Sequence, residues 1–105
     1  MSSSSVAELT AVINDARESL RTRRQAAGQL GDSVEQVAIQ TAVDLCNDRS
    51  LPRSLQEEVG RSLARLAARR GRVKETFDLH TFDMSEAAYL AYANLVETLD
   101  ETTEG

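Results

Sequence analysis

The sequence predicts an all-α protein, and three observations carry this prediction. Residues 33–46 place apolar side chains at the i, i+3, i+4, i+7 spacing of a helix and leave only a narrow polar side. Aromatic residues make up 4% of the chain and tryptophan is absent, so the core must consist of Leu, Val, Ile and Ala, as is typical of packed helices. The spacing of a capping box, which starts a helix, occurs at Ser5, Ser33 and Asp83.

Length and cysteine content narrow the class of protein further. The 105 residues are enough for one domain with one core. Cys46 is the one cysteine, which excludes an internal disulfide and suits a reducing compartment. No apolar run approaches the roughly 18 residues of a membrane span, and Met1–Ser5 lacks the charge and the following apolar block of a signal peptide. We therefore expect a cytoplasmic protein that binds no membrane.

Two helices are expected before the central one. Residues 1–5 form a flexible N-terminus, and the first helix begins at Val6 behind the capping box of Ser5. The second helix spans about residues 18–30 and ends at Gly31, which we expect to adopt a left-handed conformation as a terminator.

The central helix, residues 33–46, is predicted to have two apolar stripes and therefore packed neighbours on both flanks. It begins at the capping box of Ser33 after a two-residue corner. The first stripe consists of Val34, Val37, Ala38, Thr41, Ala42 and Leu45, and the second of Ile39, Val43 and Cys46.

The C-terminal half is expected to hold two more helices. Pro52 suits the first turn of a helix that runs to Gly71. Residues 72–82 show no clear period but are too apolar for a solvated linker. The last helix spans residues 83–99, and residues 100–105 form a disordered acidic tail.

The chain resembles itself when it is shifted so that residues 12–15 fall on residues 45–48. This shift aligns one Asn-Asp turn with another Asn-Asp turn. It also places Ala26 on Val59, and a leucine falls on a leucine four positions later. A helix, a turn and a second helix therefore recur as a unit.

Residues 20–32, LRTRRQAAGQLGD, resemble the second helix of a HEAT-like (armadillo-type) repeat, with its basic pair, two alanines, leucine and Gly-Asp. The resemblance implies a short right-handed α-solenoid of about five helices, with repeats at about residues 6–31 and 33–71 and a capping helix at 83–99. The second repeat, QEEVGRSLARL, lacks the arginine pair and the final Gly-Asp. The last helix matches no part of the motif. HEAT-like proteins mostly bind other proteins, and a minority follow the backbone of nucleic acids.

Two rows of arginines are candidates for the binding surface. Arg61, Arg65 and Arg69 recur every four residues on the fourth helix. Arg17, Arg21 and Arg24 form a similar row on the second helix. Such rows bind phosphates or an acidic protein surface, because arginine makes paired hydrogen bonds to either. The alternative is a solvated face, in which nearby glutamates form weak ion pairs with the arginines.

The acidic C-terminal part is the second candidate. Residues 1–74 carry twelve basic and nine acidic side chains, whereas residues 75–105 carry eight acidic ones and no basic one. Tyr89, Tyr92 and Val96 form a second apolar side of the last helix, which is either a contact with a partner or second copy, or part of the cap. The acidic candidates are Asp78, Asp83, Glu86, Glu97, Asp100 and Glu101.

Catalytic and metal chemistry have little basis in the sequence. His80 is the one histidine, without a second nitrogen or sulfur ligand at metal spacing. Cys46 is expected in the core, where a thiol is inert. We expect no enzyme activity, no catalytic residue, no metal and no cofactor.

These observations together predict a protein-interaction module that covers one macromolecular partner. The specific version that we favour resembles the small acidic immunity proteins with which bacteria neutralise a toxin, where the negative end would meet a basic nuclease domain. Binding of a nucleic acid backbone along the arginine rows is the alternative, although a pI near 4.8 is unusual for that class. A homodimeric structural adaptor is a third possibility, and the oligomeric state, monomer or homodimer, stays open.

Overall fold

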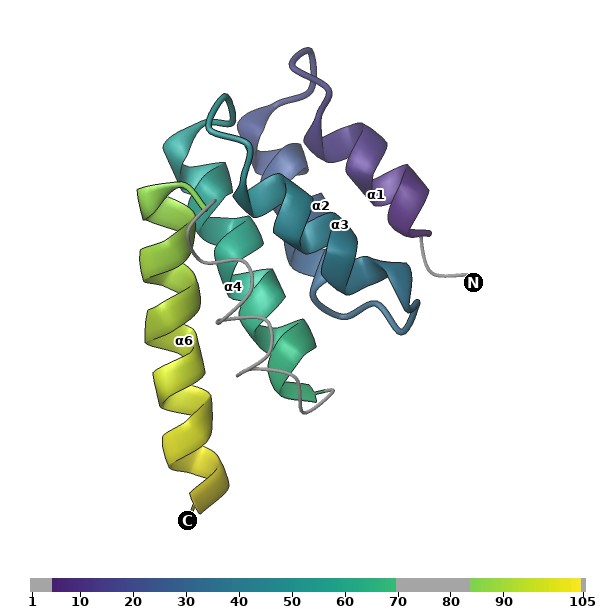
Figure 1. Cartoon of the computed structure of the whole chain (residues 1–105). Helices are drawn as coiled ribbons and strands as arrows, with labels where there is room; N and C mark the ends of the chain where they lie inside the picture. Colours follow the sequence, from purple (N-terminus) through teal and green to yellow (C-terminus); the bar gives the residue numbers. More distant parts are fainter. Residues whose placement is uncertain (1–4, 70–83, 105) are drawn as a thin grey trace.

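The computed structural model describes residues 5–69 and 84–104, and every regular element within these ranges is a helix (Figure 1). The all-α class is therefore confirmed for the described part of the chain. The helices are α1 (Val6–Ile13), α2 (Leu20–Leu30), α3 (Val37–Cys46), α4 (Arg53–Arg69) and α6 (Glu86–Glu104).

The described helices are arranged around α4. This helix packs against α2, α3 and α6, while α1 packs against α2 and touches α3. In Figure 1, α6 lies along one side of α4, and α1 lies at the opposite end of the molecule. The expectation that the central helix has neighbours on both flanks is confirmed, because α3 lies between α1 and α4. The largest fully buried apolar side chains include Ile13, Leu30, Leu55, Leu63, Leu66 and Tyr92.

A constant spacing recurs in the helix boundaries, and it equals the shift that aligns the sequence with itself. Helices α2, α4 and α6 begin at residues 20, 53 and 86, and α1 and α3 end at residues 13 and 46. Ala26, Val59 and Tyr92, which occupy the same position in α2, α4 and α6, are all buried. The sequence comparison matched the last helix to no repeat, because α6 shares almost none of the motif residues. The buried side chain of Tyr92 nevertheless occupies the same position along α6 as Ala26 does along α2 and Val59 along α4.

The predicted start of the central helix is wrong. α3 begins at Val37 behind Gln36, whose side chain makes no capping hydrogen bond. Val34 and Val37 are 90% and 51% exposed, so they do not belong to a buried stripe. Glu35 is used elsewhere: its Oε2 accepts the backbone N–H of Val6 at 2.8 Å and so caps α1. An acidic side chain of this corner therefore serves a neighbouring helix.

The end of α2 also differs from its prediction. Gly31 has φ −64° and ψ −16°, a right-handed conformation, so it is not a left-handed terminator. The guanidinium group of Arg65 packs where a Cβ atom of residue 31 would lie, so a side chain at this position would displace it. The start of α2 lies at Leu20, where Ser19 Oγ accepts the N–H of Thr22 and caps the helix.

The first and last helices begin where capping side chains place them. Ser5 and Glu8 form the predicted reciprocal capping box of α1. At α6, Ser85 Oγ accepts the N–H of Ala88 at 3.2 Å. α6 runs to Glu104, whereas the sequence predicted an end near Leu99 with a disordered tail beyond it. The predicted segment 72–82 and the box residue Asp83 lie outside the described residues.

Candidate functional site

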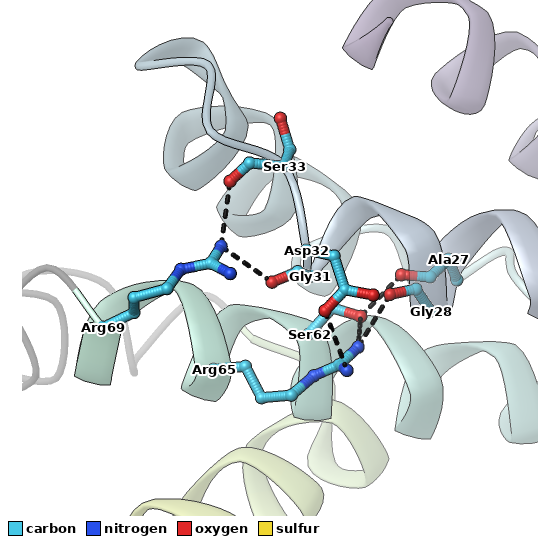
Figure 2. A network of polar contacts seen from close by, with 8 residues as sticks. All are labelled: Ala27, Gly28, Gly31, Asp32, Ser33, Ser62, Arg65 and Arg69. Carbon is cyan, nitrogen blue, oxygen red and sulfur yellow. Dashed lines mark hydrogen bonds and ion pairs between the residues drawn. The ribbon is translucent and has the colours of Figure 1, made fainter. Parts of the chain in front are cut away.

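The arginine row of α4 is directed largely at the protein itself (Figure 2). Arg65 Nη2 donates to the carbonyl oxygen of Gly28 at 2.7 Å. Arg69 Nη2 donates to the carbonyl oxygens of Gly31 and Ser33 at 3.0 and 2.8 Å. These carbonyls lie at or just beyond the C-terminal turn of α2, where the helix dipole favours a positive charge. The carbonyl of Gly28 also accepts the backbone N–H of Gly31 at 3.2 Å.

Ser62 completes this connection between α4 and α2. Its buried hydroxyl donates to the carbonyl oxygen of Ala27 at 2.5 Å. Arg65 Nη1 also lies 3.4 Å from Asp32 Oδ1, in an exposed ion pair that contributes little to stability. Arg61 pairs with Glu58 on its own helix at 3.0 Å. The α4 row is therefore an internal contact first, and any binding role would compete with it.

The row predicted on the second helix is more open, although Arg17 precedes α2 and so does not belong to it. Sequence reasoning missed the buried arginine of this helix. Arg23 is only 9% exposed, and its Nε donates to the carbonyl oxygen of Ile13, the last residue of α1, at 2.9 Å. Arg21 and Arg24 are exposed, and Arg17 pairs with Asp15. The signal for Arg23 was available: it stands at helical spacing before the buried Ala26, Ala27 and Leu30.

The residues predicted at the acidic end do not come together as one described site. Asp78 and Asp83 lie outside the described residues. Glu86 and Glu97 are exposed on α6, but the length of helix between them separates them by about 16 Å. The structure gives the backbone of residues 100–104, and hence of Asp100 and Glu101, as helix.

The two tyrosines of α6 have different environments. Tyr92 is completely buried in the core, and Tyr89 is half-buried beside it. Of the two alternatives for this side of the last helix, the burial of Tyr92 favours a packing role over a contact with a partner. Burial raises the pKa of its phenol to about 12, with a smaller contribution from the nearby Cys46.

An open groove lies between α1 and α3, where the two helices run side by side (Figure 1). Its volume is about 760 Å³, within the range of pockets that hold ligands. The apolar part of its lining comes from both helices and includes exposed small residues of α1. The lining residues are Ser5, Val6, Ala7, Thr10, Ala11, Asn14, Glu35, Val37, Thr41, Asp44, Leu45 and Asp48.

The charge of this groove is negative. Glu35, Asp44 and Asp48 line it, and among the described residues no lysine, arginine or histidine does. Each carboxylate is held in place by a hydrogen bond: Glu35 by Val6 N–H, Asp44 by Gln40 and Asp48 by the backbone and hydroxyl of Ser50. The rim is therefore ordered before any partner arrives.

Sequence reasoning did not find this groove. Val37 and Thr41 were assigned to a buried stripe, but Val37 is half-exposed and Thr41 partly so, because both face the groove. On α1, Ala7 and Ala11 are exposed one turn apart, beside the buried Val6, Leu9 and Ile13. A second row of small apolar residues next to a core stripe was the available signal.

The described residues offer no group of three or more histidine, cysteine or acidic side chains that could hold a metal ion. Cys46 is buried, and burial raises the pKa of its thiol to about 12, which keeps it protonated and unreactive at neutral pH. None of the helices in residues 5–69 and 84–104 has the length and hydropathy needed to cross a membrane. Comparison of the chain with protein-family models, curated proteins and solved structures gives no significant match.

Proposed function

We propose that this protein is a protein-interaction module, and that the groove between α1 and α3 holds part of one protein partner. The observation that carries the proposal is the combination of an open apolar floor with three ordered carboxylates and no basic side chain in the described lining. An apolar groove with a charged rim is a common way for a protein to receive a segment of another protein. The exposed side chains of Val34 and Val37 extend this surface near one end of the groove.

The proposed architecture is a short α-solenoid of the HEAT-like kind. The constant spacing of the helix boundaries supports it. In this arrangement α1 and α3 are first helices of successive units, and α2, α4 and α6 are second helices. The groove then lies between first helices. Solenoids commonly bind along such extended surfaces.

Within this class, the specific proposal is an immunity protein that neutralises a bacterial toxin in the cytoplasm. The negative groove supports a basic target such as a nuclease domain, because complementary charge accelerates and orients association. The small acidic chain is compatible with that role.

The other two functions receive less support from the side-chain contacts. Arg65 and Arg69 already donate to carbonyls of the α2 end, which weakens the case for binding along a nucleic acid backbone. A homodimer through the tyrosine face of α6 would lack Tyr92, which is buried.

Affinity capture with a groove-blocking variant tests the proposal. Ala11→Arg places a long side chain in the groove, and Ala16→Arg adds the same charge at an exposed position outside the groove lining. Wild type and both variants would be incubated with lysate of the source organism, with and without nuclease treatment. We expect wild type and Ala16→Arg to retain the same nuclease-resistant protein and Ala11→Arg to lose it. Equal capture by all three, or capture that depends on nucleic acid, would refute the proposal.

A further inference from the structure

The α1 wall of the α1–α3 groove is built from small side chains, since Ala7 and Ala11 are exposed there one helical turn apart. On the α3 wall the open side chains are those of Val37 and Thr41, also one turn apart. Small residues in such rows let the axis of a third helix approach, because its side chains fit between them as ridges into a groove. A bound helix requires a concave groove of this kind, whereas a partner that binds through a flat surface does not.

The rim of the groove adds a requirement for positive charge. Asp44 and Asp48 stand one turn apart at the end where α3 finishes, and α3 has no basic residue in its last turn. The partial negative charge of the helix end therefore adds to the two carboxylates. Glu35 lines the groove near the start of α1. An occupant with anionic side chains would face repulsion along the whole rim.

We propose that the occupant of this groove is a cationic amphipathic helix of a protein partner. This rests on the proposed function, and it specifies the chemistry of the partner. The apolar side of the helix would lie on Ala7, Ala11 and Val37, and its lysines or arginines would pair with Asp44 and Asp48. A helix contributed by a second copy of this chain is the competing occupant.

Three synthetic peptides of about 18 residues test the proposal, since peptides of this length can form a helix on binding. The first is a Leu/Ala/Lys amphipathic helix. The second keeps its apolar side and replaces each lysine with glutamate. The third has the composition of the first in an order without helical periodicity. Binding to the full chain is measured by fluorescence anisotropy, and the site is mapped by backbone amide shifts in nuclear magnetic resonance spectra.

Two charge-matched variants separate the groove from the general acidity of the chain. Asp44→Asn with Asp48→Asn removes two groove charges and keeps oxygen acceptors for Gln40 and Ser50. Glu86→Gln with Glu97→Gln removes two charges from the exposed face of α6. We expect the first pair to weaken the cationic helix about 3- to 10-fold and the second pair to change its affinity less than about twofold.

We expect that, of the three peptides, only the cationic amphipathic one binds, and that it changes the amide chemical shifts of α1 and α3. Equal binding of the anionic or the aperiodic peptide, shifts elsewhere, or no binding of any peptide would overturn the proposal. Dimerisation that Ala11→Arg abolishes, seen by sedimentation velocity, would overturn it in favour of a second copy. If Ala11→Arg still loses its lysate partner while the cationic peptide fails, the proposed function survives and only the choice of a cationic helix is wrong.

Discussion

Arg65 and Arg69 place their guanidinium groups against carbonyl oxygens at the end of α2, where the helix dipole favours a positive charge. From the sequence, their spacing on α4 shows only that they share one face. Whether that face meets solvent, a ligand or the end of another helix depends on contacts between segments far apart in the chain. The sequence therefore predicted the row correctly, but the local pattern contained no information about the carbonyls that it serves.

Arg65→Met is expected to lower the free energy of unfolding by about 1 kcal/mol, because the carbonyl of Gly28 loses a charged donor but keeps the N–H of Gly31, and the aliphatic part of the side chain is kept. Urea unfolding followed by circular dichroism measures this change. Arg21→Met, at an exposed position of α2, is the matched control and should change stability by less than about 0.5 kcal/mol. Equal effects of the two substitutions would mean that the contact of Arg65 with α2 contributes nothing.

At the scale of the helix, local capping signals were reliable where they acted on their own segment. Ser5 stands directly before α1, as predicted, whereas Pro52, predicted in the first turn of the fourth helix, stands directly before α4. Ser33 does not cap α3: its Oγ accepts the backbone N–H of Glu35, and the carboxylate of Glu35 caps α1. A capping carboxylate satisfies whichever backbone N–H lies nearest in space, and the sequence shows only which one lies nearest along the chain.

The crossing of α4 and α6 depends on Gly60. A Cβ atom there would overlap the backbone carbonyl of Ala88, which cannot rotate away as a side chain would. We expect Gly60→Ala to lower the free energy of unfolding by about 1–3 kcal/mol, since the two helices must separate. Thermal unfolding by calorimetry, analysed together with urea unfolding, measures the loss.

Gly28 provides the internal control for this prediction. It lies within α2, and a Cβ atom there would meet Glu58 Oε2 at 3.8 Å, an ordinary contact. Gly28→Ala should therefore stabilise the protein by up to about 1 kcal/mol, because alanine has the higher helix propensity. Stabilisation by Gly60→Ala as well would show that α4 and α6 do not cross as closely as the structure has them.

At the scale of the whole molecule, the internal repeat was the strongest sequence signal, and it reappears in the helix boundaries. The sequence comparison stopped at two units because α6 keeps the buried positions while replacing the residues: Tyr92 stands where Ala26 and Val59 stand in α2 and α4. The groove escaped prediction for a related reason. It depends on the distance between α1 and α3, which the packing of α2 and α4 beneath them determines.

The core of the whole molecule encloses two acidic groups that titrate in the alkaline range. Burial raises the pKa of Cys46 from 9.0 and that of Tyr92 from 10.0, each to about 12. Between these values the unfolded chain releases protons that the folded protein keeps. The free energy of unfolding is therefore unaffected below about pH 9 and falls as the pH rises from there toward 12, by about 1.4 kcal/mol per pH unit for each group once its unfolded form is ionised.

The chain is well suited to testing this alkaline loss, because eleven of its twelve basic residues are arginines, which keep their charge, and one is lysine. Urea unfolding of wild type, Cys46→Ala, Tyr92→Phe and the double variant would be compared at about pH 8, 9.5 and 10.5. We expect wild type to lose stability with pH most steeply, each single variant less steeply, and the double variant least. The test compares the slopes of the free energy of unfolding against pH, since both substitutions also change packing, and hence stability, at every pH. Parallel slopes in all four proteins would mean that the thiol and the phenol ionise as easily in the folded protein as in the unfolded chain, so that neither is enclosed by the core.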